Sequence, residues 1–102
     1  MGIGYTFYED LKFKDGRILN PNFANYRLPR SRGTPPMETI LIETIDPEGP
    51  FGAKGMGEAA LLPTSAAIAN AIHDAVGVRI KELPITPEKI LKALKEKKRG
   101  DV

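Results

Sequence analysis

The side chain best placed to do chemistry in this sequence lies in a glycine-rich stretch. Residues 50–60 read Pro-Phe-Gly-Ala-Lys-Gly-Met-Gly-Glu-Ala-Ala, directly ahead of a predicted helix. Glycines this dense let backbone N–H groups approach a ligand closely. A glutamate held in a water-poor pocket can act as a base near neutral pH, because desolvation raises the pKa of a carboxyl group. Glu58 is therefore the candidate catalytic base.

Glycine spacing alone leaves this interpretation open. A flexible connection with a solvated Glu58 is the simpler alternative. The stretch lacks the Gly-Lys-Ser/Thr ending of a nucleotide-binding P-loop, and it does not follow a strand as the G-x-G-x-x-G dinucleotide fingerprint does. The spacing therefore excludes two common glycine-rich loops. It does not decide whether Glu58 is a catalytic base or a solvated residue of a flexible connection.

Composition narrows the chemistry further. The chain has no cysteine, which excludes disulfides, thiolate zinc sites and iron–sulfur ligation by its own residues. Its one histidine, His73, excludes a multi-histidine metal site. The 15 basic and 13 acidic residues give a net charge of +2, too balanced for binding driven by nucleic-acid phosphates or anionic lipid. We expect no metal ligand, no nucleic-acid partner and no membrane partner.

The sequence also carries no targeting signal that we can identify. The longest apolar run falls far short of the ~20 residues that span a bilayer, and no basic start leads into an apolar core. A cytoplasmic location is therefore expected. At 102 residues, positions 1–102 form one domain at most, or a fragment of one.

The predicted elements define an α+β fold, in which a small hairpin and a central strand pack with two or three helices. A short helix is expected near the start, and Asp15-Gly16 is a two-residue hairpin signal. Residues 20–36 are rich in proline, asparagine and glycine and are expected to be ordered coil. Residues 38–45 are dense in β-branched side chains, which favours a central strand.

The second half is predicted to be mainly helical. Residues 63–76 are rich in alanine, with Pro63 in the first turn and Gly77 just past the end. Residues 78–80 are a candidate short strand. A second helix is expected to begin with Thr86 as N-cap and Pro87 as its first residue.

Several motifs together resemble the C-terminal part of the molybdenum-binding subunit of the xanthine dehydrogenase and aldehyde oxidoreductase family. The most specific motif is Phe51-Gly-Ala-Lys-Gly-Met-Gly-Glu58. The resemblance covers nearly the whole chain. The other matching segments are Gly2–Tyr5, Asn20–Phe23 with Tyr26, Leu61–Thr64, Ala67–Ile72, Asp74–Ile80 and Leu83–Leu91.

The resemblance implies a function for the glycine-rich loop. It implies a hydroxylation of a purine, N-heterocycle or aldehyde with water as oxygen source, with Glu58 as the catalytic base. It also implies a molybdopterin cofactor shared with other segments, and iron–sulfur clusters and FAD on partner subunits or domains. The residues expected to lie against the cofactor are Ala53, Lys54, Gly55, Met56 and Gly57.

The sequence departs from the family pattern at three places. The usual Gly-Glu-Pro-Pro reads Gly57-Glu-Ala-Ala60, Met1 stands where a glutamine is usual, and Arg30-Ser-Arg32 is not a family signature. The chain is also far shorter than the family's subunit, so a C-terminal piece that is incomplete alone is expected. Its partners would be the remainder of the molybdenum-binding subunit and the iron–sulfur and flavin subunits. The alternative is a non-catalytic assembly or binding module that keeps the fold.

Overall fold

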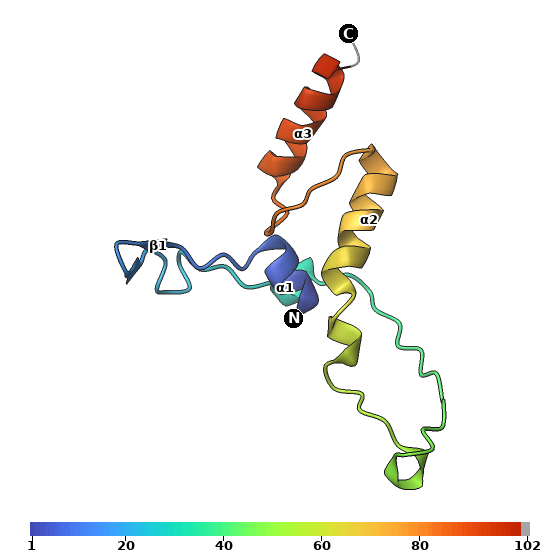
Figure 1. Ribbon diagram of the computed structural model, residues 1–102. Coiled ribbons are helices and arrows are strands. Elements are labelled where there is room, and N and C mark those ends of the chain that lie inside the picture. The colour runs from blue at the N-terminus through green and yellow to red at the C-terminus, as the bar shows by residue number, and fades with distance from the viewer. Residues whose placement is uncertain (101–102) are drawn as a thin grey trace.

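The computed structural model describes residues 1–100, which fold into helices and one small hairpin (Figure 1). The α+β prediction is confirmed. The regular elements are α1 (Gly2–Phe7), β1 (Phe13–Lys14), β2 (Arg17–Ile18), α2 (Thr64–Val76) and α3 (Pro87–Gly100). Short 3-10 turns lie at Ser31–Gly33, Pro50–Gly52 and Ala59–Leu61.

The molecule is extended for its mass. It exposes 9082 Å², whereas a compact monomer of 11.2 kDa exposes about 5,700 Å². Its radius of gyration is 18.4 Å, against about 13 Å for a compact domain of this length. Figure 1 shows the reason. The hairpin extends away from the helices, and so does a long loop at residues 34–58, which we call the excursion.

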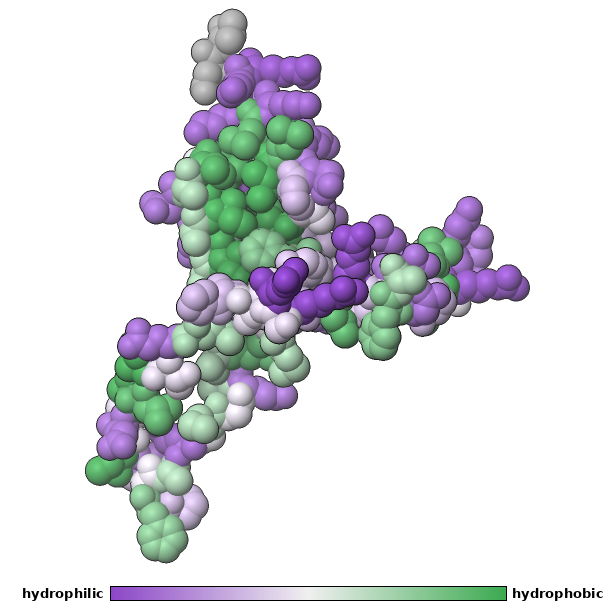
Figure 2. Space-filling model, turned by 180° about the vertical axis from the view of Figure 1, so that it is seen from behind, coloured by the Kyte–Doolittle hydropathy of each residue, from purple (hydrophilic) through white to green (hydrophobic). Residues whose placement is uncertain are grey.

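Little apolar surface is buried within this chain. Among the described residues, the buried hydrophobic side chains are Val78 and Ile85. Figure 2 shows apolar surface over the region of α2 and α3 and again on the excursion. Leu91 is 53% exposed in the first of these regions, and Ile42 is 82% exposed in the second. No helix in residues 1–100 is long and apolar enough to cross a membrane.

A polar junction joins α1 to α2 and to the segment before α3. The fully buried Thr6 donates its hydroxyl to the Gly2 carbonyl at 2.6 Å, and its Oγ1 lies 2.7 Å from Ser65 Oγ. The backbone N–H of Ile85 donates to the Thr6 carbonyl at 2.7 Å. At Gly2, a Cβ would overlap the Thr64 side chain, so glycine is required where the two helices touch.

Removing the Thr6 hydroxyl should weaken this junction. Thr6→Val keeps the side-chain shape but leaves the half-buried Ser65 hydroxyl without this partner, so we expect a loss of about 1–3 kcal/mol in the free energy of unfolding. Urea denaturation followed by circular dichroism measures it. Thr6→Ser keeps the hydroxyl and should lose less; equal losses for the two variants would show that the hydrogen bonds contribute nothing.

The predicted ends of the two longer helices are confirmed. Helix α2 ends at Gly77, which has the left-handed conformation (φ 69°) and donates its N–H to the His73 carbonyl at 2.7 Å. Helix α3 begins at Pro87, and Thr86 Oγ1 accepts the N–H of Lys89 at 3.4 Å. The end of α2 and the start of α3 therefore lie where the sequence indicated, whereas α2 begins at Thr64, one residue after the predicted Pro63.

The start of α3 should depend on pH through Glu88. Hydrogen bonds from its own backbone N–H and from the Thr86 side chain lower the pKa of the Glu88 carboxyl. Because the pKa is lower in the folded chain, this stabilisation is complete above the unfolded value of about 4.3 and is lost as pH falls through the folded pKa. We expect Glu88→Gln to show a smaller acid-induced loss of helix by circular dichroism than the unchanged chain. Identical acid curves would contradict this.

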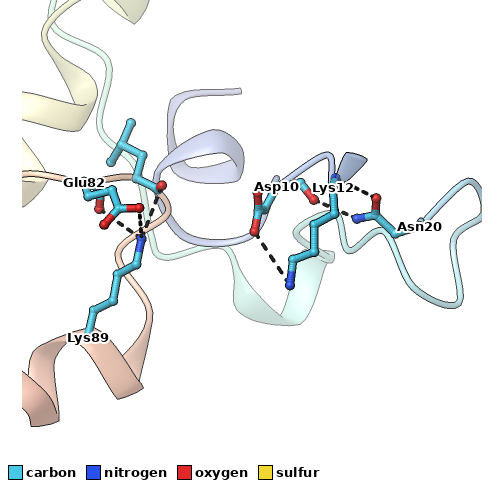
Figure 3. A network of polar contacts seen from close by, with 6 residues as sticks. Asp10, Lys12, Asn20, Glu82 and Lys89 are labelled. Carbon is cyan, nitrogen blue, oxygen red and sulfur yellow. Dashed lines mark hydrogen bonds and ion pairs between the residues drawn. The ribbon is translucent and has the colours of Figure 1, made fainter. Parts of the chain in front are cut away.

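Polar side chains fix the segments that flank the helices (Figure 3). Asn20 accepts the Lys12 N–H at 2.9 Å and donates to the Asp10 carbonyl at 2.7 Å, which closes the base of the hairpin. At the other junction, Lys89 Nζ lies 3.7 Å from a Glu82 carboxylate oxygen. These contacts hold the entry to the hairpin and the approach to α3.

The hairpin forms as predicted, but it does not pack on the helices. Its turn residues Asp15 and Gly16 have φ angles of 49° and 73°, as a two-residue hairpin turn requires. Phe13 pairs with Ile18 across the strands. Both side chains remain exposed, at 61% and 44%, so the hairpin is only partly covered within residues 1–100.

Two predicted strands are wrong for this chain. Residues 38–45 and residues 78–80 are not strands in the structure. A strand needs a neighbour with which to exchange backbone hydrogen bonds, and the only ladder in residues 1–100 is the hairpin. Residues 78–80 instead form an extended connection that buries Val78. The β-branched composition of residues 38–45 favours a strand but cannot supply its partner.

Candidate functional site

A compact turn leads into the glycine-rich loop. The Asp46 N–H donates to the Gly52 carbonyl at 3.2 Å, and the Gly49 N–H donates to the Asp46 carbonyl at 3.2 Å. The Asp46 carboxylate also accepts the Glu48 N–H at 3.0 Å. A Cβ at Gly49 would overlap the Ala53 carbonyl oxygen, so this glycine is required by packing within the chain.

The tip of this turn has an unusual backbone. Phe51 has φ 55°, which is uncommon for a residue with a side chain, and its ring is fully exposed. The next residue, Gly52, has φ 76°, and a Cβ there would lie 2.8 Å from Ile45 Cγ2. The turn is therefore packed against the end of residues 38–45.

The glycines nearest Glu58 have a different environment. Within the described structure, a Cβ on Gly55 or Gly57 would have no heavy atom within 4 Å, and neither residue has a positive φ in the range that favours glycine. Neither backbone conformation nor packing in this chain therefore requires glycine at these positions. The Lys54 side chain donates a hydrogen bond to Thr44 Oγ1, which ties the loop back to the extended segment.

Glu58 lies at the end of the loop, directly before the Ala59–Leu61 turn. Its carbonyl accepts the Leu61 N–H at 2.9 Å, and its side chain is exposed. In residues 1–100 the carboxylate makes no ion pair and no capping hydrogen bond. The predicted site residues 53–58 thus form one continuous exposed loop. At its end lies the Glu58 carboxylate, which forms no ion pair in residues 1–100.

The structure brings no metal-binding cluster to this loop. Across residues 1–100, no group of three or more histidine, cysteine, aspartate or glutamate side chains could hold a metal ion. His73 lies half-buried in α2.

An open groove that the sequence did not predict lies beside α1. It has a volume of about 760 Å³ and is lined by Tyr8, Phe23, Ala24, Tyr26, Arg27, Leu28, Pro29, Arg30, Arg32 and Gly33. Partial burial and a 3.1 Å hydrogen bond to Glu9 raise the pKa of Tyr26. In the sequence, Arg30 and Arg32 stand out as a departure from the family pattern. The groove forms because residues 23–33 turn back toward α1, which no local motif indicates.

The chain is similar to parts of much longer enzymes. It is 37% identical over 92 residues to the putative xanthine dehydrogenase molybdenum-binding subunit XdhA of Escherichia coli K12, covering 88% of this chain and 12% of that protein. It is 40% identical over 97 residues to the aldehyde oxidoreductase molybdenum-binding subunit PaoC of the same strain, covering 92% and 13%. The sequence matches no protein-family model.

A solved structure gives the same result. The chain matches quinoline 2-oxidoreductase from Pseudomonas putida 86 with a TM-score of 0.79 and 31% identity, over 93% of this chain and 13% of that one. The chain is therefore homologous to a segment of a molybdenum-binding enzyme subunit. The segment it resembles belongs to the molybdenum-binding subunits of xanthine dehydrogenases and aldehyde oxidoreductases, and the chain spans about one eighth of the length of these relatives.

Proposed function

We propose that this chain supplies the glycine-rich loop of the active centre of a molybdenum hydroxylase, with Glu58 as the catalytic base. The reaction is the hydroxylation of a purine, an N-heterocycle or an aldehyde, with water as the oxygen source. The names of the relatives, which include xanthine, aldehyde and quinoline enzymes, support this substrate class. The open space beside Gly55 and Gly57, directly before an uncommitted carboxylate, is the structural observation that carries the proposal.

The residues of the loop fit a large cofactor. With no heavy atom within 4 Å of a Cβ at Gly55 or Gly57, the backbone of the described chain is free to receive a flat group at close range. Ala53, Lys54 and Met56, all exposed, complete the surface that faces it. When bound, the molybdenum cofactor would accept the two electrons that are released as the C–H bond of the substrate breaks. No residue of this chain is proposed as a metal ligand.

Glu58 acts as the base that removes a proton from water. Its carboxylate accepts a proton from the water that provides the oxygen atom, which makes that oxygen a better nucleophile toward an electron-poor carbon. The backbone hydrogen bond from Leu61 fixes the peptide carbonyl of Glu58, so the side chain starts from a defined position at the end of the loop. The surrounding subunit would exclude water and hold the substrate.

The remaining parts of the enzyme come from outside residues 1–102. We propose that the partners are the rest of a molybdenum-binding subunit together with iron–sulfur and flavin subunits, and that the complex is cytoplasmic. Because the chain spans about one eighth of its relatives, it should have no turnover alone.

A chimeric subunit tests this function. In the chimera, the matched segment of PaoC is replaced by residues 1–102 of this chain. We expect it to bind molybdenum cofactor and to oxidise aldehydes, and we expect Glu58→Gln to remove the oxidation. A chimera that retains cofactor and turns over equally well with glutamine at position 58 would contradict the proposed base. The isolated chain as a stable, metal-free monomer beside a cofactor-free chimera would favour the non-catalytic module instead.

A further inference from the structure

The extended segment 38–45 has apolar side chains on both faces and no neighbouring strand in residues 1–100. Ile40 and Ile42 are 76% and 82% exposed, and Leu41 and Ile45 are 69% and 87% exposed. Successive side chains of an extended segment point to opposite faces, so the first pair lies on one face and the second pair on the other. Glu38 and Glu43 add one carboxylate to each face. Apolar side chains on both faces of a strand are typical of a sheet covered on both sides.

The backbone of the same segment is also unpaired. Within residues 1–100, no backbone–backbone hydrogen bond joins residues 37–45 to any other residue. The side-chain contact from Lys54 to Thr44 is the polar interaction that reaches it. Figure 1 shows the segment as one limb of the excursion, away from the helices. Its N–H and C=O groups therefore form an open row of donors and acceptors, which is a template for strand pairing.

We infer that residues 38–45 form a strand that pairs within a sheet contributed by the remainder of a molybdenum-binding subunit. The inference rests on the proposed function for the identity of this partner. The match to quinoline 2-oxidoreductase supports it, because this chain adopts a similar path, with a TM-score of 0.79, as 13% of a much longer crystallised chain. The remainder of such a chain is the surface available to cover both apolar faces. A second copy paired edge to edge would leave those faces in water.

The pairing would also position the glycine-rich loop. The compact turn begins at Asp46, the residue that directly follows the segment, and Gly52 is packed against Ile45. Lys54 adds its hydrogen bond to Thr44. Fixing residues 38–45 in a sheet therefore fixes the base of the loop that ends at Glu58, so these are positioning residues for the active centre.

Hydrogen exchange of the backbone amides tests the pairing directly. In the isolated chain, we expect the amides of residues 38–45 to exchange rapidly. In the chimera, we expect exchange to slow on the order of 100-fold or more, because the amides become hydrogen-bonded in a covered sheet. Rapid exchange of these amides in a chimera that holds cofactor would overturn the inference. Slow exchange in a homo-oligomer of the isolated chain would also overturn it, in favour of a second copy.

A matched pair of variants separates pairing from simple apolar contact. Ile42→Pro removes one N–H and should reduce the yield of cofactor-loaded chimera at least about tenfold, whereas Ile42→Val keeps the N–H and a β-branched side chain and should have little effect. Because residue 42 is exposed in the isolated chain, both variants should leave its circular dichroism unchanged. Equal yields from the proline and valine chimeras would show that no strand pairing occurs.

The outcome is distinguishable from a failure of the proposed function. Slow exchange at residues 38–45 together with full turnover of the Glu58→Gln chimera would keep the strand and remove the base. Turnover that depends on Glu58, together with unprotected amides at residues 38–45, would keep the base and remove the strand.

Discussion

Glu58→Gln in the chimera should lower aldehyde turnover by about 10²–10⁴-fold while leaving the molybdenum content unchanged. Glutamine has nearly the size of glutamate but cannot accept the proton, so the loss measures acid–base chemistry and not packing. Because the Glu58 side chain is exposed and makes no ion pair in residues 1–100, the substitution removes no such stabilising contact from the chain itself. Turnover at saturating aldehyde and metal analysis of the same sample provide the measurement.

Glu48→Gln is the matched control for this experiment. Glu48 is an exposed acid in the compact turn that precedes the loop, and the same charge is lost when it is replaced. We expect its chimera to keep nearly full turnover, since only its backbone N–H makes a hydrogen bond to Asp46. An equal loss from both substitutions would indicate a general effect of charge and would remove Glu58 from the mechanism.

Local signals predicted the helices and the hairpin well. Gly77 ends α2 because only its left-handed conformation continues the chain there, and Thr86 with Pro87 begins α3 by satisfying or removing free N–H groups. Asp15-Gly16 forms the predicted hairpin turn, because both residues adopt the positive φ angles that this turn requires. In each case the residues that decide the conformation are adjacent in the sequence.

The wrong predictions concern features that depend on distant partners. Residues 38–45 have strand composition, but a strand is defined by a neighbouring strand, and residues 1–100 provide none for this segment. The hairpin was expected to pack on helices, and its apolar side chains remain exposed for the same reason. A pattern of apolar residues indicates that a surface must be covered but cannot say which chain covers it.

The candidate site likewise combines what the sequence shows with what it cannot show. The density of glycines before Glu58 is visible in the sequence, yet the sequence could not distinguish the glycines that this chain requires from those it does not. The structure separates them: Gly49 and Gly52 are required by contacts with Ala53 and Ile45, whereas a Cβ at Gly55 or Gly57 would meet no heavy atom within 4 Å in residues 1–100. The second pair is therefore not explained by contacts within residues 1–100, and the proposed cofactor contact would account for it.

Replacing Gly57 with valine should leave the isolated chain unchanged but weaken cofactor retention in the chimera. In the isolated chain, the added side chain meets no heavy atom within 4 Å of its Cβ, so circular dichroism and the urea midpoint should not change. In the chimera, the same side chain would occupy the space proposed for the cofactor. Overpacking of this kind typically costs 1–3 kcal/mol, which corresponds to roughly 5–150-fold weaker cofactor retention. Molybdenum content after dialysis measures this loss.

Two other glycines give the controls that make this result specific. Gly100→Val adds the same side chain at a position that is also open but lies in α3, and its chimera should retain molybdenum. Gly52→Val should already disturb the isolated chain, because it combines φ 76° with a 2.8 Å approach of its Cβ to Ile45. Full retention of molybdenum by the Gly57→Val chimera would mean that the space beside Gly57 holds only solvent. Because Glu58 is the next residue, that result would also separate the carboxylate from any cofactor, whereas selective loss at Gly57 would support close contact between the loop and the cofactor.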